Sequence, residues 1–292
     1  MSDFWTRYPD GLPGKRIRLG RLVQPETGRG VVPTIAHGAF LGPLPGEPEG
    51  PDTAGFIRTL GDAGADSVLV TPGMLGRAAA GFVGRGAPGA LVVIDWTNQF
   101  REPGEMLGFD EGRHALVASV EDALRLGADG VLTYLFRGLD DPRAEAEQVA
   151  YNGRVSRDCE RLGMVRAIET MTRGRRVGDR ARAPELVRAH TRLAAEIGAD
   201  LIKTEWTGDV DSFKRVVRSC PVPIFVAGGP SSGGPRAALE LAHDAMRAGA
   251  MGLVFGRHVV QAPDPLRLVA ALAGIVHHGW SVGRAAEALE SS

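Results

Sequence analysis

The chain has 292 residues, of which 43% are hydrophobic, and a formal net charge of −1 with acidic and basic residues mixed along its length. This length suits a single α/β barrel with a large core, and the balanced charge argues against a surface that binds nucleic acid. No segment approaches about 18 apolar residues, the first residues form no apolar signal core, and the two cysteines show no CxxC spacing. We therefore expect a cytoplasmic protein without a membrane span.

The predicted elements begin with a lead-in segment over residues 1–30, which can hold a helix that closes the bottom of a barrel over residues 31–292. Eight short apolar runs follow, typical of strands that are buried on both faces in a parallel sheet. They cover 31–36, 66–71, 90–95, 129–135, 164–170, 200–204, 222–227 and 251–256, with helical patterns between most pairs and two more near 265–277 and 281–290. Eight βα units predict a single (β/α)8 TIM barrel, and an open doubly wound sheet is the alternative.

A recurring tripeptide marks the point where a helix gives way to a strand. It reads Gly-Ala-Asp at 64–66, 127–129 and 198–200, and Gly-Ala-Met at 249–251. Glycine suits the left-handed position that ends a helix, and the apolar run after it suits the next strand. The Pro- and Gly-rich residues 42–51 instead predict a stiff loop after the first strand, at the catalytic end of a barrel.

Lysine is rare in this chain, which has only Lys15, Lys203 and Lys214 among its 34 basic residues. Lys203 lies within a short apolar strand, whereas the other two have polar neighbours. Burial favours the neutral amine, and an arginine could not replace it because arginine stays protonated and forms no imine. Lys203 is therefore a candidate Schiff-base nucleophile, although a strand lysine is more commonly a structural ion-pair partner.

A Gly-Gly pair and a Gly-Arg pair follow the last two predicted strands. Gly228 and Gly229 follow the seventh strand, and Gly256 and Arg257 end the eighth. In barrels the loops after these two strands commonly hold a phosphate, because their backbone N–H groups point at the anion. Each of these two pairs alone indicates no more than a turn, but their joint position beside a sixth-strand lysine predicts a phosphate site.

These motifs resemble the archaeal-type class I fructose-bisphosphate aldolases and the related 2-amino-3,7-dideoxy-D-threo-hept-6-ulosonate synthases, within the deoxyribose-phosphate aldolase-like group. The resemblance rests on His-Gly-Ala-Phe-Leu-Gly-Pro at 37–43, Ile-Lys-Thr at 202–204, Ala-Gly-Gly-Pro at 227–230 and the final strand up to Arg257, and it covers most of residues 12–290. It implies a TIM barrel, a lysine imine with a phosphorylated ketone, no cofactor, no metal, and a ring-like homo-oligomer, up to a decamer. The seven histidines likewise show no HxH or HExxH spacing.

Two positions depart from the family pattern. The first strand normally ends in Asp-His-Gly, but here Ala36 stands in place of the aspartate. The family's general acid/base is a tyrosine near the end of the fifth strand, and here Met171 takes its place. Because neither side chain can transfer a proton, we expect poor activity on fructose 1,6-bisphosphate.

Polar residues near the strand ends are candidate replacements for the missing groups. Glu169 lies two residues before Met171, and so on the same face of the strand, which makes it the leading candidate. The other candidates are Glu205, Tyr134, Asp95 and the retained His37. Each of these residues taken alone is more commonly structural than catalytic.

The sequence thus predicts a class I aldolase-like lyase that forms or cleaves a carbon–carbon bond in a phosphorylated ketose or a related keto compound. One alternative is a thiolase-type enzyme that transfers an acyl group from a phosphorylated diketone. The other alternative is a non-catalytic sugar-phosphate-binding homologue. The expected partner is a small phosphorylated carbonyl compound, with no nucleic acid and no membrane.

Overall fold

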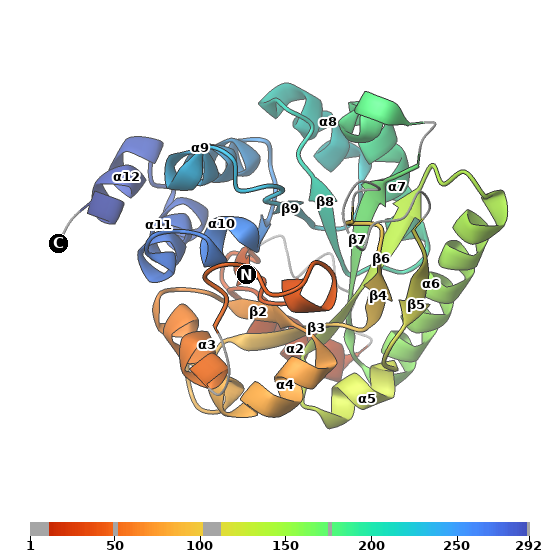
Figure 1. Ribbon diagram of the computed structural model, residues 1–292, viewed down its shortest axis with the longest axis horizontal. Coiled ribbons are helices and arrows are strands. Elements are labelled where there is room, and N and C mark those ends of the chain that lie inside the picture. The colour runs from red at the N-terminus through yellow and green to blue at the C-terminus, as the bar shows by residue number, and fades with distance from the viewer. Residues whose placement is uncertain (1–11, 49–51, 102–111, 175–176, 291–292) are drawn as a thin grey trace.

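The computed structural model describes residues 12–48, 52–101, 112–174 and 177–290 (Figure 1). Eight parallel strands form one sheet in the order β1-β10-β9-β8-β7-β6-β3-β2. Their bounds are β1 Gly30–Pro33, β2 Ser67–Val70, β3 Gly89–Val93, β6 Gly130–Arg137, β7 Val165–Thr172, β8 Leu201–Glu205, β9 Ile224–Ala227 and β10 Gly252–Phe255. The first and last strands of this order, β1 and β2, are joined by an isolated β-bridge between Thr34 and Leu69. Beside it, the N–H of Ile35 donates a hydrogen bond to the carbonyl of Leu69 (3.0 Å), and these contacts close the sheet into a barrel. The predicted TIM barrel is confirmed, and the open sheet is excluded.

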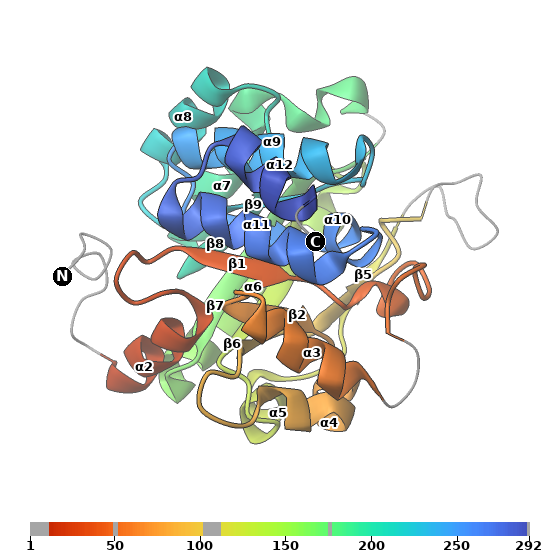
Figure 2. The same ribbon diagram turned by 90° about the vertical axis from the view of Figure 1, so that its left-hand side faces the viewer.

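Helices surround the barrel (Figures 1 and 2). They are α3 Thr53–Asp62, α4 Pro72–Ala78, α5 Val120–Arg125, α6 Pro142–Leu162, α7 Pro184–Glu196, α8 Val210–Ser219, α9 Gly234–Arg247, α10 Arg257–Val260, α11 Pro265–His278 and α12 Val282–Glu290, with 3-10 turns η1 His37–Ala39, η3 Ala79–Phe82 and η4 Gly178–Arg182. Figure 2 shows α11 lying over β1. Within the described ranges, no helix combines the length and apolar character that crossing a membrane requires.

The Gly-Ala-Asp tripeptides have a structural role at the amino-terminal ends of the strands. Their glycines all have positive φ, between +87° at Gly127 and +105° at Gly64, as the helix-ending position requires. Each aspartate accepts a hydrogen bond from the first residues of a neighbouring strand: Asp66 from the N–H of Val31 (2.7 Å), Asp129 from Ala90 (2.9 Å) and Asp200 from Arg166 (2.8 Å). The repeat therefore both ends a helix and ties adjacent strands together.

Two apolar clusters fill the molecule, one between the sheet and the helices and one inside the barrel. The inner cluster is closed from below by helix α2 (Pro13–Leu22), whose Leu19 and Leu22 are fully or almost fully buried. Phe225 points into the same space, where a Cβ on Gly252 would lie 2.4 Å from its ring. These side chains leave only a small void of about 20 Å³ in the lower part of the barrel. The space that can take a ligand therefore lies at the carboxyl ends of the strands.

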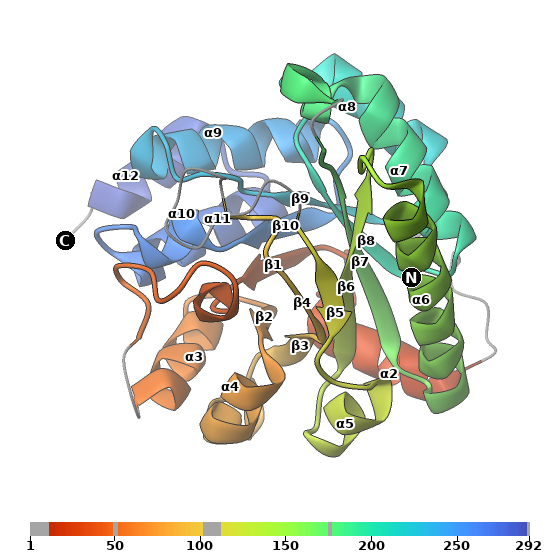
Figure 3. The same cartoon turned by 45° about the vertical axis from the view of Figure 1, so that its right-hand side comes forward.

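A short antiparallel hairpin, not predicted from the sequence, follows β3 at the carboxyl end of the barrel. Its strands are β4 Asp95–Thr97 and β5 His114–Leu116. Figure 3 shows the hairpin standing beside β6. The strand predicted over 90–95 therefore covers parts of two elements. Residues 90–93 belong to the barrel strand β3, and Asp95 begins β4.

Candidate active site

A cavity of about 570 Å³ opens at the carboxyl ends of the barrel strands. Its walls come from strand ends and from the loops that follow them, including the 3-10 turn η4 and the described ends of the loop between β4 and β5. Lys203 is the only one of the three lysines that lines this cavity. Lys15 pairs with Glu160 (2.6 Å) and Asp200 (3.1 Å), and Lys214 lies on the outer helix α8 beside Asp211.

Three of the predicted site residues form one row across neighbouring strands. Tyr134 on β6 is in register with Glu169 on β7, and Glu169 is in register with Lys203 on β8. The Nζ of Lys203 lies 2.7 Å from Oε2 of Glu169, and both side chains are buried, with exposed fractions of 11% and 3%. Strand alternation therefore places the amine and the carboxyl group inside the barrel at the same height.

The pKa of Glu169 is raised above its ordinary value, mainly because burial penalises the charged carboxylate. The ammonium group of Lys203 opposes this rise, and the nearby Glu205 adds to it. A carboxyl group of this kind can take the proton of the lysine and later return it. The pair can thus provide both a neutral amine and a general acid.

Tyr134 contributes a hydroxyl group that has no hydrogen-bond partner among the described residues, although the side chain lines the cavity. Burial, followed by the charges of Glu169 and Asp95, raises the pKa of this phenol well above its ordinary value. Its ring packs edge-on against Phe40 and Phe100. Tyr134 therefore remains protonated near neutral pH and can donate a hydrogen bond to a ligand in the cavity.

The two positions that depart from the family pattern also line the cavity. Ala36 and Met171 are buried, with exposed fractions of 3% and 7%. The sulfur of Met171 accepts a hydrogen bond from Arg173 (3.3 Å), and the same arginine contacts Glu205 (3.3 Å). Arg182 also pairs with Glu205 (3.4 Å), so two arginines flank this carboxylate. The structure thus gives Glu205 an ion-pairing role at the cavity wall.

The predicted phosphate site lies at the carboxyl ends of β9 and β10, and β9 pairs with β8, the strand that carries Lys203. Gly228, Gly229, Gly256 and Arg257 all line the cavity. The pKa of Arg257 is lowered, first by burial and then by the positive charges of Arg173 and Arg182. Three arginines therefore create a positive field at the place where an anion is expected.

The glycines at this site serve different purposes. A Cβ on Gly228 would lie 2.8 Å from His258, whose Nε2 contacts the Gly228 carbonyl at 2.9 Å. A Cβ on Gly256 would lie 2.3 Å from the ring of His37. Gly229, with φ of +69°, meets only the end of Arg182 at 3.8 Å. Only Gly229 thus leaves its Cβ position open toward a ligand, whereas the other two make room for histidine rings.

His37 lines the cavity and contacts a carboxylate that sequence reasoning missed. Its Nδ1 lies 2.7 Å from Oε1 of Glu47, and the exposed fractions of the two side chains are 15% and 11%. The other oxygen of Glu47 accepts a hydrogen bond from the N–H of Leu44 (3.2 Å). Glu47 belongs to the predicted stiff loop 42–51, of which residues 49–51 lie outside the described residues. A carboxylate is therefore present near the first strand, although Ala36 has replaced the expected aspartate.

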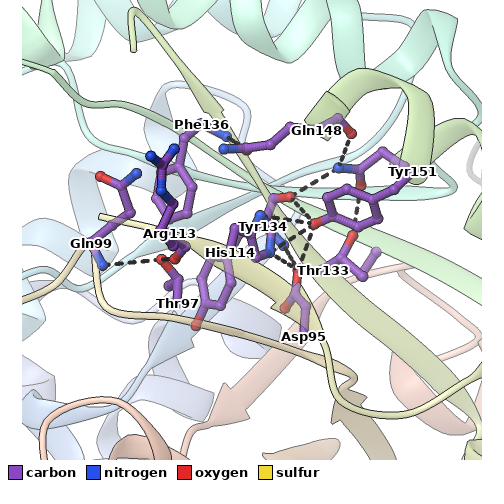
Figure 4. A network of polar contacts seen from close by, with 12 residues as sticks. Asp95, Thr97, Gln99, Arg113, His114, Thr133, Tyr134, Phe136, Gln148 and Tyr151 are labelled. Carbon is purple, nitrogen blue, oxygen red and sulfur yellow. Dashed lines mark hydrogen bonds and ion pairs between the residues drawn. The ribbon is translucent and has the colours of Figure 1, made fainter. Parts of the chain in front are cut away.

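Asp95, another predicted site residue, does not line the cavity. Its Oδ2 accepts hydrogen bonds from the Tyr134 N–H (2.7 Å) and the Tyr151 hydroxyl (2.7 Å) and contacts Nε2 of His114 (2.6 Å) (Figure 4). The backbone of Tyr134 is also held through its carbonyl, which accepts from the side-chain amide of Asn152 (3.0 Å) and lies 2.7 Å from the Tyr151 hydroxyl, whose single proton is shared between this carbonyl and Asp95. Asp95 therefore anchors the backbone of a cavity residue instead of facing the ligand space itself.

The missed residues share one property, which is that loops bring them to the site. Arg182 lines the cavity from the 3-10 turn η4, and Arg101 and Arg113 line it from either side of residues 102–111, which lie outside the described residues. Glu47 comes from a loop and reaches the site only through its contact with His37. The only available signal was their charge within predicted loops at the catalytic end. No group of three or more potential metal ligands occurs in the described parts of the chain.

Comparisons with known proteins agree with this arrangement. A family model described as DeoC/LacD family aldolase matches residues 48–262. An uncharacterised aldolase of Saccharolobus solfataricus is 31% identical over 277 residues, covering 95% of this chain and 99% of its own. The 2-amino-3,7-dideoxy-D-threo-hept-6-ulosonate synthase of Halobacterium salinarum is 35% identical over 264 residues, covering 90% and 92%.

A solved structure extends the likeness to the fold. An archaeal fructose-1,6-bisphosphate aldolase, with its catalytic lysine covalently bound to the carbinolamine intermediate of the substrate, matches with a TM-score of 0.75 and 26% identity, covering 90% of this chain and 99% of that chain. The family match spans well over half of the sequence, and the relatives align nearly end to end. The chain belongs to the DeoC/LacD family of aldolases.

Proposed function

We propose that this protein is a class I aldolase in which Lys203 forms the Schiff base with a phosphorylated ketone. The observation that carries the proposal is the buried contact between Lys203 and Glu169 (2.7 Å) inside the cavity. The archaeal relative, whose lysine is bound to a carbinolamine, supports the same chemistry for a lysine in this fold. The names of the relatives describe a ketose bisphosphate aldolase and an ulosonate synthase, which supports a phosphorylated keto substrate.

The reaction would begin with transfer of a proton from the Lys203 ammonium to Glu169. The neutral amine then attacks the carbonyl carbon, and the carbonyl oxygen takes the proton that the attacking nitrogen loses, which gives a neutral carbinolamine. Glu169, now protonated, returns its proton to the carbinolamine hydroxyl, which leaves as water as the iminium forms. The hydroxyl of Tyr134 would donate a hydrogen bond to that oxygen, since it has no partner among the described residues.

The iminium then accepts the electron pair of the breaking carbon–carbon bond. In the cleavage direction, a base removes the proton of the substrate hydroxyl as that group becomes an aldehyde, and Glu169 is available for this after giving up its own proton. Synthesis reverses these steps. Glu205 would adjust the positive field near the iminium through its pairs with Arg173 and Arg182. Asp95 would act only through the backbone of Tyr134.

The phosphate of the donor would lie at Gly229 and the turn from Gly256 to Arg257, with the arginine side chain as the charged partner. The carbonyl would then lie at Lys203, whose strand β8 pairs with β9, the strand that ends at the phosphate loop. We also propose that the protein is a homo-oligomer, a property that light scattering during size-exclusion chromatography measures.

Borohydride trapping with a panel of phosphorylated ketones and aldehydes tests the function. Intact-mass spectrometry after reduction reports both whether an imine forms and which carbonyl compound forms it. An adduct of a phosphorylated ketone supports the aldolase. A protein that binds these compounds but never gives an adduct is instead a sugar-phosphate-binding homologue.

A further inference from the structure

We propose that Glu47 and His37 act as a dyad that binds the substrate phosphate, with Glu47 positioning His37 and balancing its charge. This inference rests on the proposed aldolase function and deepens it, because it assigns a further ligand for the phosphate. It also gives a role to Glu47, a carboxylate that lies near the first strand, where Ala36 has replaced the expected aspartate.

The contact between the two side chains fixes the chemistry of the ring. A carboxylate can only accept a hydrogen bond, so Nδ1 of His37 must carry the proton that it shares with Oε1 of Glu47 (2.7 Å). The second oxygen of Glu47 is held by the N–H of Leu44 (3.2 Å), which keeps the carboxylate in place. The ring is therefore oriented, and Nε2 is the nitrogen left for a ligand.

The packing around Gly256 shows where that nitrogen lies. A Cβ on Gly256 would be 2.4 Å from Nε2 of His37 and 2.3 Å from the neighbouring Cε1. The edge of the ring thus rests against the backbone of the residue that begins the Gly256–Arg257 turn. No hydrogen bond to Nε2 of His37 occurs within the described residues, and the side chain lines the cavity. The free nitrogen is next to the proposed phosphate site.

Phosphate oxygens accept hydrogen bonds, so Nε2 must carry a proton to bind one. The ring then has a proton on each nitrogen and a positive charge, which lies between the negative charges of Glu47 and the phosphate. A charge-assisted hydrogen bond of this kind is roughly twice as strong as a neutral one. Among the residues that the structure describes, the Glu47 carboxylate forms hydrogen bonds only with His37 and the Leu44 N–H, so its effect on the phosphate should pass through His37.

The test is a double-mutant cycle on the affinity for inorganic phosphate, measured by isothermal titration calorimetry. Glu47→Gln and His37→Gln should each weaken binding by roughly ten- to a hundredfold, and the double variant should be no weaker than His37→Gln alone. Glu121→Gln, which removes an exposed carboxylate on α5, is the matched control and should bind phosphate as the unmodified protein does.

A second readout separates positioning from a general loss of structure. The KM for dihydroxyacetone phosphate in borohydride trapping should rise in Glu47→Gln, whereas the trapping rate at saturation and the KM for unphosphorylated dihydroxyacetone should stay unchanged. Unchanged phosphate affinity in Glu47→Gln, or losses in the two single variants that add in the double variant, would overturn the dyad. If Glu47→Gln does not fold, wild-type phosphate affinity in His37→Gln would overturn the dyad by itself. In each of these cases Lys203 still forms its adduct, so the proposed function stands. Absence of any adduct in the unmodified protein would instead overturn the function.

Discussion

The Nζ of Lys203 and Oε2 of Glu169 lie 2.7 Å apart on adjacent strands, inside the barrel and beside a cavity of about 570 Å³. Burial raises the pKa of Glu169, and the lysine partly reverses that rise. The amine that must lose a proton and the carboxyl group that can accept it are therefore already in contact before any ligand arrives. Met171, two residues further along the same strand, occupies the position where the family pattern has its acid/base tyrosine.

Replacing Glu169 with glutamine should lower turnover of the physiological substrate by at least about a hundredfold, because general acid–base groups typically contribute 10²–10⁴-fold. Borohydride trapping on Lys203 should largely persist, since the amide keeps the shape of the site. Steady-state kinetics and adduct mass measure the two effects. Glu185→Gln, at an exposed carboxylate on α7, is the control. Normal turnover by Glu169→Gln would exclude this residue as the acid/base.

Removing the amine should make stability depend on pH. In Lys203→Met the buried carboxyl group loses the charge that lowers its pKa, so the pKa of Glu169 rises further. The pKa of Glu169 in the folded variant is then above its value in the unfolded chain. The free energy of unfolding is therefore highest at low pH and falls as the pH rises through the folded-state pKa. In urea unfolding, the free energy of unfolding of Lys203→Met should be lower than that of the unmodified protein by up to about 3–5 kcal/mol at about pH 8 and by less at about pH 5.

The variant Lys203→Met/Glu169→Gln is the control for this pH effect, because it has no buried ionisable group left at the pair. It should recover most of the stability at high pH. A loss that is equal at both pH values would mean that the destabilisation comes from packing and not from the unpaired carboxylate.

Arg257→Ala should weaken the binding of phosphorylated ligands by roughly 1–3 kcal/mol, the range for a charge-assisted hydrogen bond. Binding of matched unphosphorylated ligands should change little. Calorimetry on both ligand types measures the difference, with Arg236→Ala on the outer face of α9 as the control. Equal losses for the two ligand types would contradict a phosphate role for this arginine.

Cleavage of fructose 1,6-bisphosphate should be about 10²–10⁴-fold slower than is usual for the family, because Ala36 and Met171 cannot transfer a proton. Met171→Tyr should raise this activity, since residue 171 lines the cavity on the same strand as Glu169. A coupled assay for triose phosphate release measures it, and Met74→Tyr on helix α4 is the comparison. Family-typical rates in the unmodified protein would show that the proton-transfer groups have not moved.

Much of the barrel could be predicted because its signals are local. The Gly-Ala-Asp repeats combine a helix-ending glycine with an aspartate that ties two strand ends together, as at Asp129 and the N–H of Ala90 (2.9 Å). Strand alternation was sufficient to place Glu169 on the same face as Met171, and the structure shows that this face is the inner one, where the register of β7 and β8 pairs Glu169 directly with Lys203. These relationships follow from periodicity and need no information about loops.

Where the chain leaves the regular elements, prediction failed for physical reasons. Asp95 was expected to end a barrel strand, but β3 ends at Val93 and the following hairpin turns the carboxylate toward Tyr151. Arg182 reaches the cavity from a 3-10 turn, and Glu47 contacts the cavity residue His37 from a loop; in neither segment does a period connect sequence position with direction. The contact of His37 with Glu47 depends on how the loop folds back, which composition alone does not specify.

The most direct test of the central claim is peptide mapping after borohydride reduction with the phosphorylated ketone that the panel identifies. We predict that the peptide containing Lys203 gains the mass of the reduced ketone and that Lys203→Arg abolishes the gain, because arginine forms no imine. Lys15, which is in ion pairs at the opposite end of the barrel, and Lys214, on an outer helix, should remain unmodified. An adduct on either of these two lysines, with none on Lys203, would contradict the account.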